Sequence, residues 1–377
     1  MDSTYTLIET QKDLEAILPL LWSADRVGVD LEADSMFHFR EKVCLIQLGI
    51  ENRNFVLDPV SIPDLSPLGP VFADPAVRKV FHGADYDVRS LFRDFGFVLE
   101  NLWDTELATR FLGHRSSGLD AVLQARFGVS LDKKYQKKDW SQRPLSKEMI
   151  AYAAGDTRYL LPLSQALEAE LAALGRLAWV EEECALLQQV RAPEVEERPL
   201  FLRFKGAGRL DRRSLAVLEA LLEFRLEMAE KKDKPLFKVL GGEALLRLAQ
   251  VKPRTLEDIR NLKVLSPRQL SMYGHGLLAA IHGALSLSEG DLPLYPKTRA
   301  MRVKPLVSLR IKALKTWRDS LAEELDLDPA LLCNKALLTQ LAQLNPKTLD
   351  RVWSIPEMRR WQKEVLGEGI VGVLSGL

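Results

Sequence analysis

The sequence predicts an α/β domain in residues 1–190, followed by two small all-α domains. Three observations lead to this fold class. Short runs rich in Val, Ile and Leu dominate the first 84 residues, as in buried strands. From Asp85 onward apolar residues recur at the three-to-four spacing of helices. The second half contains an internal repeat with an offset of 93 residues.

The first 60 residues predict one strand, one helix and then three strands. A short helix and the strand-like run RKVFHGA (78–84) follow, and then helices in 87–96, 105–113 and 118–128, each ending at Gly. A long helical stretch runs from 146 to 190, with Pro162 as a candidate interruption. The early elements are YTLIE (5–9), TQKDLEAILPLLWS (10–23), RVGVDLEA (26–33), KVCLIQLGI (42–50) and NFVLD (54–58).

The repeat predicts two copies of one helical domain. LAQVKPRTLEDI (248–259) aligns with LAQLNPKTLDRV (341–352), and FR at 224–225 aligns with WR at 317–318. Pro235 matches Pro329 only if one residue is inserted. With only two copies, tandem domains are favoured over a solenoid. The predicted domains are 206–287 and 306–377, with linkers at 191–205 and 288–305.

The composition is ordinary for a globular protein, with 47% hydrophobic and 28% charged residues. Cys44, Cys184 and Cys333 are too sparse for a disulfide framework or a zinc site, which favours a reducing compartment. The chain shows neither a basic-then-apolar leader nor an apolar run long enough for a membrane span. We therefore expect a cytoplasmic protein that does not cross a membrane.

The net charge of zero conceals an asymmetry between the halves. Residues 1–200 hold 22 Lys and Arg against 32 Asp and Glu, whereas residues 201–377 hold 30 against 20. One interpretation is a metal-binding or catalytic first half and a polyanion-binding second half; the other is a random surface imbalance. Trp317, Trp353 and Trp361 either stack on bases or fill small helical cores. The concentrated basic features are KKYQKKDW (133–140), KKDK (231–234), Arg209, Arg212 and Arg213.

Acidic residues gather at three places in the first half. In RVGVDLEADSM (26–36), Asp30, Glu32 and Asp34 share one face of the predicted strand because side chains alternate. Carboxylates from separate elements converge when a divalent cation such as Mg²⁺ or Mn²⁺ binds them. Each place alone has a simpler interpretation: a DxE strand occurs in many sheets, acids near a helix start are often caps, and acid and tyrosine one turn apart are often a surface pair. The other two places are FHGADYD (81–87), with Asp85 and Asp87, and YAAGDTRYL (152–160), with Tyr152 and Asp156 one helical turn apart.

Together these motifs resemble those of a known nuclease family. DLE (30–32), FHGADYD and YAAGDTRYL resemble the three exonuclease motifs of the DEDD superfamily, and Tyr152 resembles the tyrosine of its DEDDy branch. The stretch DWSQRPLSKEMIAYAAGDTRYLLPL (139–163) is similar to ribonuclease D, and the two repeats resemble HRDC domains.

The resemblance implies an RNase H-like fold with a mixed five-stranded sheet. It also implies a metal-dependent 3′→5′ exoribonuclease that releases nucleoside 5′-monophosphates and trims tRNA precursors and other structured RNAs. Two divalent ions, Mg²⁺ or Mn²⁺, would be held by Asp30, Glu32, Asp87 and Asp156. Tyr152 would orient the attacking water with help from Glu32. A phenol with an ordinary pKa near 10 is better suited to that role than to general base catalysis.

Several choices stay open at this point. The family spacing from His82 favours Asp87 over Asp85 as the metal ligand, and Asp85 suits a helix cap or first-turn acid. Candidate substrate contacts are His82, Asp104, Lys137 and Lys138. No protein partner is readable from the sequence. A DNA exonuclease and a non-catalytic RNA-binding adaptor are the alternatives, although the presence of all five motif residues argues against the adaptor.

Overall fold

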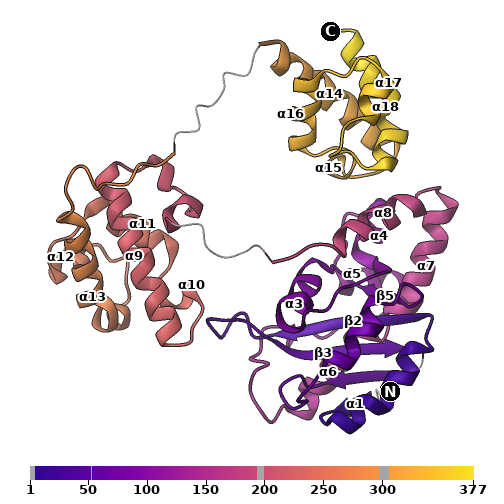
Figure 1. Cartoon of the computed structure of the whole chain (residues 1–377), viewed down its shortest axis with the longest axis horizontal. Helices are drawn as coiled ribbons and strands as arrows, with labels where there is room; N and C mark the ends of the chain where they lie inside the picture. The colour runs from indigo at the N-terminus through magenta and orange to yellow at the C-terminus, as the bar shows by residue number, and fades with distance from the viewer. Residues whose placement is uncertain (1–4, 52, 193–198, 297–304) are drawn as a thin grey trace. The chain divides into compact units, whose positions relative to one another are not determined.

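A computed structural model of the protein describes residues 5–51, 53–192, 199–296 and 305–377 (Figure 1). These residues divide into two compact units. The first unit comprises the described residues within 1–33, 43–192 and 302–377, and the second those within 34–42 and 193–301. Parts of both predicted linkers, 193–198 and 297–304, lie outside the described residues.

A six-stranded mixed sheet forms the centre of the first unit. Its strands lie in the order β1-β4-β3-β2-β5-β6, with β3 antiparallel to β2 and β4 and the remaining pairs parallel. The predicted α/β class is confirmed, but the expected five strands miss β6, which has only three residues and therefore no readable alternation. The strands are β1 (Tyr5–Ile8), β2 (Arg26–Ala33), β3 (Val43–Ile50), β4 (Arg53–Leu57), β5 (Arg78–Phe81) and β6 (Leu102–Asp104).

Helices cover the sheet, and the single helical stretch predicted at 146–190 forms three helices. The stretch 146–190 breaks after Thr157 and again before Leu177, not at Pro162. Pro162 lies in the first turn of its helix, where a backbone N–H has no intrahelical partner to lose. None of the described helices is long and apolar enough to cross a membrane. The helices are α1 (Gln11–Trp22), α2 (Gly69–Ala73), α3 (Asp85–Phe95), α4 (Thr105–Phe111), α5 (Leu119–Phe127), α6 (Lys147–Thr157), α7 (Leu160–Ala173) and α8 (Leu177–Leu187), with a 3-10 turn at Ser66–Leu68.

The repeat corresponds to two blocks of five helices, seen in Figure 1 as α9–α13 and α14–α18. The last four helices of the second block each begin 93 residues after their counterparts in the first. No inserted residue is needed at the prolines, because Pro235 precedes its helix as the N-cap and Pro329 is the first helical residue. The pairs are α9 (Arg212–Lys231) with α14 (Pro305–Glu324), α10 (Leu236–Val239) with α15 (Pro329–Leu332), α11 (Gly242–Val251) with α16 (Lys335–Leu344), α12 (Leu256–Asn261) with α17 (Leu349–Trp353), and α13 (Pro267–Leu285) with α18 (Arg360–Ser375).

One packing detail recurs in both blocks. The ring of Phe224 lies so close to Gly276 that a Cβ there would approach it to 2.4 Å. Trp317 and Gly369 repeat the contact at the same offset, with 2.1 Å. Trp317 is therefore a packing residue of its block, as its counterpart Phe224 is.

The other aromatic and basic candidates differ in their exposure and in the groups that they contact. Trp361 is 2% exposed and stacks on Trp179 within the first unit, with ring centroids 4.9 Å apart. Trp353 is 45% exposed. Arg212 donates to the carbonyls of residues 289 and 292, and Arg213 donates to that of 287. These two arginines hold the end of their own block together.

Candidate active site

The central strand β2 carries the first two acids of the site. It is hydrogen-bonded to β3 on one side and β5 on the other, so its backbone is fixed. Asp30 and Glu32 point to one face because they lie two residues apart. The register shifts after Glu32, where a bulge ends the regular pairing.

Two glycines let α6 approach this face closely. Gly28 of β2 and Gly49 of β3 are register partners. A Cβ on either would come within 3.4 Å of the Thr157 carbonyl oxygen at the end of α6. The last turn of α6, which holds Asp156, therefore lies against the sheet next to β2. Tyr152 lies one turn earlier on the same helix.

A buried carboxylate positions the third element, α3. Asp104 is 2% exposed and accepts the N–H groups of Gly83 and Ala84 at 2.9 and 2.8 Å. It also caps α4 by accepting the N–H groups of residues 106 and 107. Asp104 thus ties the turn before α3 to the start of α4, with both oxygens facing backbone donors. That turn sets the position of Asp87 on α3.

Four carboxylates meet here with raised pKa values. Burial first, and then the neighbouring carboxylates, raise the pKa of Glu32 to about 10 and that of Asp156 to about 8. Burial raises the pKa of Asp30 to about 7, and burial together with the charge of Asp30 raises that of Asp87. In the part of the chain that the structure describes, none of the four forms an ion pair.

The two acids of FHGADYD have different surroundings. Asp87 is partly buried and interacts electrostatically with Asp30. Asp85 is exposed, begins α3 and pairs with Arg89 at 2.7 Å, a contact that lowers the pKa of Asp85. The structure thus brings Asp87, but not Asp85, to the cluster on β2 and α6.

Tyr152 lies beside two aromatic rings near the cluster. The ring centroids of Tyr135 and Trp140 are 5.8 and 6.0 Å from its own. Burial, followed by the charges of Asp156, Glu32 and Asp30, raises the pKa of the Tyr152 phenol above its ordinary value of 10.0. The phenol is therefore neutral at physiological pH and can donate a hydrogen bond.

A partly buried ion pair holds the segment that leads into α6. Arg143 donates to both carboxylate oxygens of Asp58, at 2.6 and 2.7 Å. It also donates to the carbonyls of Cys44 on β3 and of Trp140. This segment, and with it the start of α6, is thereby fastened to the sheet.

The other predicted contacts lie around the cluster. The hydroxyl of Thr105 donates to the Phe81 carbonyl and accepts from Nδ1 of His82 at 3.0 Å. Nε2 of His82 is buried, and burial lowers the pKa of His82. Lys137 and Lys138 are exposed in the turn before Trp140.

Asp34, which was predicted on the same strand face as Asp30 and Glu32, lies outside the cluster. It follows the last residue of β2 and is 4% exposed. Its carboxylate accepts the N–H of Lys42 at 2.6 Å and so closes the base of the loop 34–42.

Gln47 is a polar residue of this face that our sequence analysis missed. It lies on β3 directly opposite Asp30 and is fully buried. Neither atom of its amide has a hydrogen-bond partner among the described residues. The available signal was a single amide in the otherwise apolar strand VCLIQLGI.

The donor chemistry of the cluster fits a hard divalent cation. Four carboxylates supply the oxygen ligands that Mg²⁺ and Mn²⁺ prefer, and a cation would favour their charged forms. Across the described ranges, no group of three or more His, Cys, Asp or Glu side chains is already arranged to hold a metal ion. The residue types therefore fit the metal, while their side chains are not drawn into a coordination sphere.

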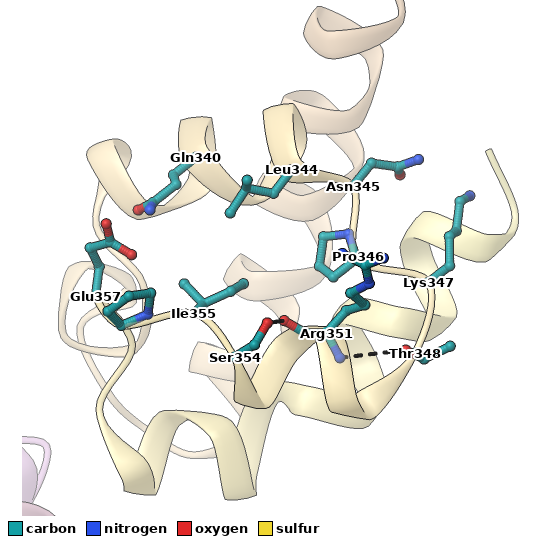
Figure 2. A pocket seen from close by; sticks show the side chains of 11 residues that line it. Gln340, Leu344, Asn345, Pro346, Lys347, Thr348, Arg351, Ser354, Ile355 and Glu357 are labelled. Atoms are coloured by element: carbon teal, nitrogen blue, oxygen red, sulfur yellow. Dashed lines mark hydrogen bonds between the residues drawn. The ribbon is translucent and has the colours of Figure 1, made fainter.

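A separate cavity of about 690 Å³ lies in the second helical block (Figure 2). Gln340 and Leu344 of α16 line it opposite Ile355, and Lys347 and Arg351 line its basic side. Glu357 is its only acidic lining residue. The cavity therefore has neither the ligands nor the location of the carboxylate cluster.

Comparison with known proteins identifies both parts of the chain. Residues 5–172 match the family of 3'-5' exonucleases, and residues 214–281 and 309–374 match the HRDC domain. Ribonuclease D of Granulibacter bethesdensis is 30% identical over 375 residues, covering 98% of this chain and 93% of that protein. Ribonuclease D of Escherichia coli is 29% identical over 373 residues, covering 98% of each.

Solved structures agree with the sequence matches. The crystal structure of Escherichia coli RNase D, described as an exoribonuclease involved in structured RNA processing, aligns over 99% of both chains with a TM-score of 0.73 and 28% identity. The catalytic core of RRP6 from Trypanosoma brucei aligns over 75% of this chain and 80% of that one, with a TM-score of 0.64 and 30% identity. The chain therefore belongs to the ribonuclease D family and is a 3′→5′ exoribonuclease.

Proposed function

We propose that this exoribonuclease uses two divalent metal ions, Mg²⁺ or Mn²⁺, held by Asp30, Glu32, Asp87 and Asp156. The observation that carries the proposal is the meeting of these four carboxylates, from β2, α3 and α6, without a basic partner in the described residues. A phosphodiester is itself anionic, so bare carboxylates would repel it. Bound cations would supply the attraction for the scissile phosphate and favour attack by water.

Each acid has a distinct place in this proposal. Asp30, whose charge acts on each of the other three carboxylates, would contact both ions. Glu32 and Asp156 would complete the site on the α6 side, and Asp87 would hold the ion on the α3 side. The product expected from hydrolysis at the 3′ end is a nucleoside 5′-monophosphate.

Tyr152 would orient the attacking water and not remove its proton. Its neutral phenol is an unsuitable base, because burial and the nearby carboxylates raise its pKa. The rings of Tyr135 and Trp140 restrict its movement, which favours one orientation of the hydroxyl. Glu32 would assist by accepting a hydrogen bond from the same water.

We propose structured RNAs, tRNA precursors among them, as the cytoplasmic substrates. The exposed Lys137 and Lys138 would contact the RNA near its end, and His82 remains a candidate contact beside them. Asp104 would act indirectly, by holding the turn before α3. We retain 1–190, 206–287 and 306–377 as the proposed domains.

The helical blocks would add RNA affinity. On α17, Trp353 is 45% exposed and the neighbouring Arg351 is also exposed, so a base could stack on the ring while the guanidinium pairs with phosphate. Trp353→Ala should weaken RNA binding. Trp22→Ala, a change at a tryptophan that is 48% exposed on α1, is the matched control and should not.

A direct test uses 5′-labelled RNA and DNA of one sequence. With Mg²⁺ or Mn²⁺ the enzyme should shorten the RNA from its 3′ end and release 5′-monophosphates, and chelation should stop the reaction. Degradation that persists under chelation would remove the metal mechanism. Equal or faster cleavage of the DNA would favour the DNA exonuclease, and binding without cleavage would favour the adaptor.

A further inference from the structure

Gln47 is the feature of the site face that the proposed mechanism leaves unexplained. It is 0% exposed, and neither its amide nitrogen nor its amide oxygen has a partner among the described residues. Most buried polar groups in folded proteins are hydrogen-bonded, since an unpaired one is destabilising. A residue that only filled this space would be expected to be apolar.

The neighbours of Gln47 make an apolar residue the natural choice. Its register partner on β4 is Val56, and Leu45 lies two positions earlier on the same face of β3. Both belong to the apolar cluster beneath α6, which also includes Ala153 and Ala154. Packing therefore does not account for a glutamine at this position.

The sheet register gives the amide one charged neighbour. Gln47 is directly opposite Asp30 in the antiparallel β2–β3 pair. Directly opposed residues point to the same face, with Cβ atoms about 4.5–5.5 Å apart. A glutamine side chain is long enough to cover that separation.

We propose that Gln47 is a positioning residue, whose amide N–H donates to the Asp30 carboxylate when that carboxylate holds a divalent cation. This inference rests on the proposed metal site at Asp30. Groups that hydrogen-bond a metal ligand fix its orientation, and their removal typically weakens metal binding or activity about 10- to 100-fold. Gln47 would have this role for the ligand at the centre of the cluster.

The test is Gln47→Met, which keeps the length and approximate volume of the side chain and removes the amide. If Gln47 serves the metal, the variant in chelator should be as stable as wild type or more stable. Its Tm should be higher by at most about 2–4 °C. Its Mn²⁺ affinity, measured without RNA by calorimetry, should fall about tenfold or more. Turnover should fall while KM for RNA changes little.

Ser90→Ala is the matched control. Ser90 on α3 is also fully buried, and its hydroxyl has no partner among the described residues. This variant should have wild-type Mn²⁺ affinity and turnover. A loss of Mn²⁺ affinity of the same size in Ser90→Ala would indicate a general response to altered packing and would overturn the inference.

The remaining outcomes separate this inference from the proposed function. If wild type binds no Mn²⁺ at all, the proposed metal site fails. If wild type binds Mn²⁺ and Gln47→Met binds it equally well, only the role of Gln47 fails. A Gln47→Met protein that is less stable in chelator but unchanged in Mn²⁺ affinity would assign Gln47 to the fold and overturn the proposal.

Discussion

Carboxylates near the two ends of one face of β2 have opposite surroundings. At the first end, Arg26 donates to both carboxylate oxygens of Glu168, at 2.5 and 2.9 Å, and Arg78 adds a contact at 3.3 Å. At the other end, Asp30 and Glu32 lie beside two more carboxylates and form no ion pair in the described residues.

The pKa values express the same difference. Burial raises the pKa of Glu168, but the hydrogen bonds from Arg26 and Ser164 and the arginine charges outweigh it, so the net pKa is below its ordinary value of 4.5. At the Asp30 end, burial raises the pKa of all four carboxylates, and neighbouring charges raise the pKa of Glu32, Asp87 and Asp156 further. The fold therefore pairs the partly buried Glu168 with arginines and leaves carboxylates unpaired where we propose that cations bind.

Exchanging a carboxylate for its amide at each end should give opposite results, and this is the largest expected effect. Asp30→Asn should lower turnover by about 10³-fold or more, because it removes the central ligand. It should leave RNA binding measurable and should not lower Tm in chelator, because it removes an uncompensated charge.

Glu168→Gln is the matched change at the other end. It leaves Arg26 and Arg78 without their carboxylate and should lower the free energy of unfolding by about 2–3 kcal/mol. Turnover at 25 °C, where the variant is folded, should stay near wild type. Denaturant unfolding and initial rates check both variants, and a fully active Asp30→Asn or an inactive, folded Glu168→Gln would break the comparison.

A second pair of variants concerns arginines that hold a carboxylate with two bonds. Arg143 and Arg26 have similarly exposed side chains, 23% and 28%. Lysine keeps the charge but cannot make the paired bonds of the guanidinium, so both Lys variants should lose about 1–2 kcal/mol of stability.

The two lysine variants should differ in activity. Arg143 fastens the segment before α6, so Arg143→Lys should lower turnover about tenfold by loosening Tyr152, with KM for RNA little changed. Arg26→Lys should not change turnover. Equal turnover in the two variants, at matched stability, would show that the Asp58–Arg143 pair has no positioning role.

The smallest expected effect is a pH dependence at the paired end. Because the pKa of Glu168 is lowered in the folded state, its contribution to stability is present above pH 4.5 and is lost as pH falls through the folded pKa. The stability difference between wild type and Glu168→Gln should therefore shrink between pH 7 and pH 3. Unfolding curves across this range would show it, and a constant difference would mean that the ion pair does not stabilise the fold.

Local pattern was sufficient where elements were long and regular. The alternation in RVGVDLEA predicted β2 with its bounds, and the repeat predicted two copies of one helical domain, which the structure shows as two blocks of matched helices. It failed for β6, which is too short to show a period, and for the breaks around α7, because Pro162 is tolerated in a first helical turn. Alignment of the two prolines suggested an insertion that the helix starts do not contain.

The site was predictable only as far as motifs could indicate it. The motifs named the four carboxylates, but their electrostatic coupling depends on the packing of α3 and α6 against β2. Asp104 was predicted to contact the substrate. Its carboxylate instead accepts backbone N–H groups before α3 and at the start of α4. Gln47 was missed because its significance comes from the strand register opposite Asp30, which no local pattern contains.

The most direct test of the central claim counts the Mn²⁺ ions bound to wild type and to Asp30→Asn without RNA. Electron paramagnetic resonance of free Mn²⁺ at physiological pH gives the number bound per chain. If the four carboxylates hold two metal ions, wild type should bind two Mn²⁺ ions per chain. Asp30→Asn should lose at least one of them, and Glu168→Gln should bind Mn²⁺ as wild type does. Equal binding by wild type and Asp30→Asn, or no binding by wild type, would contradict it.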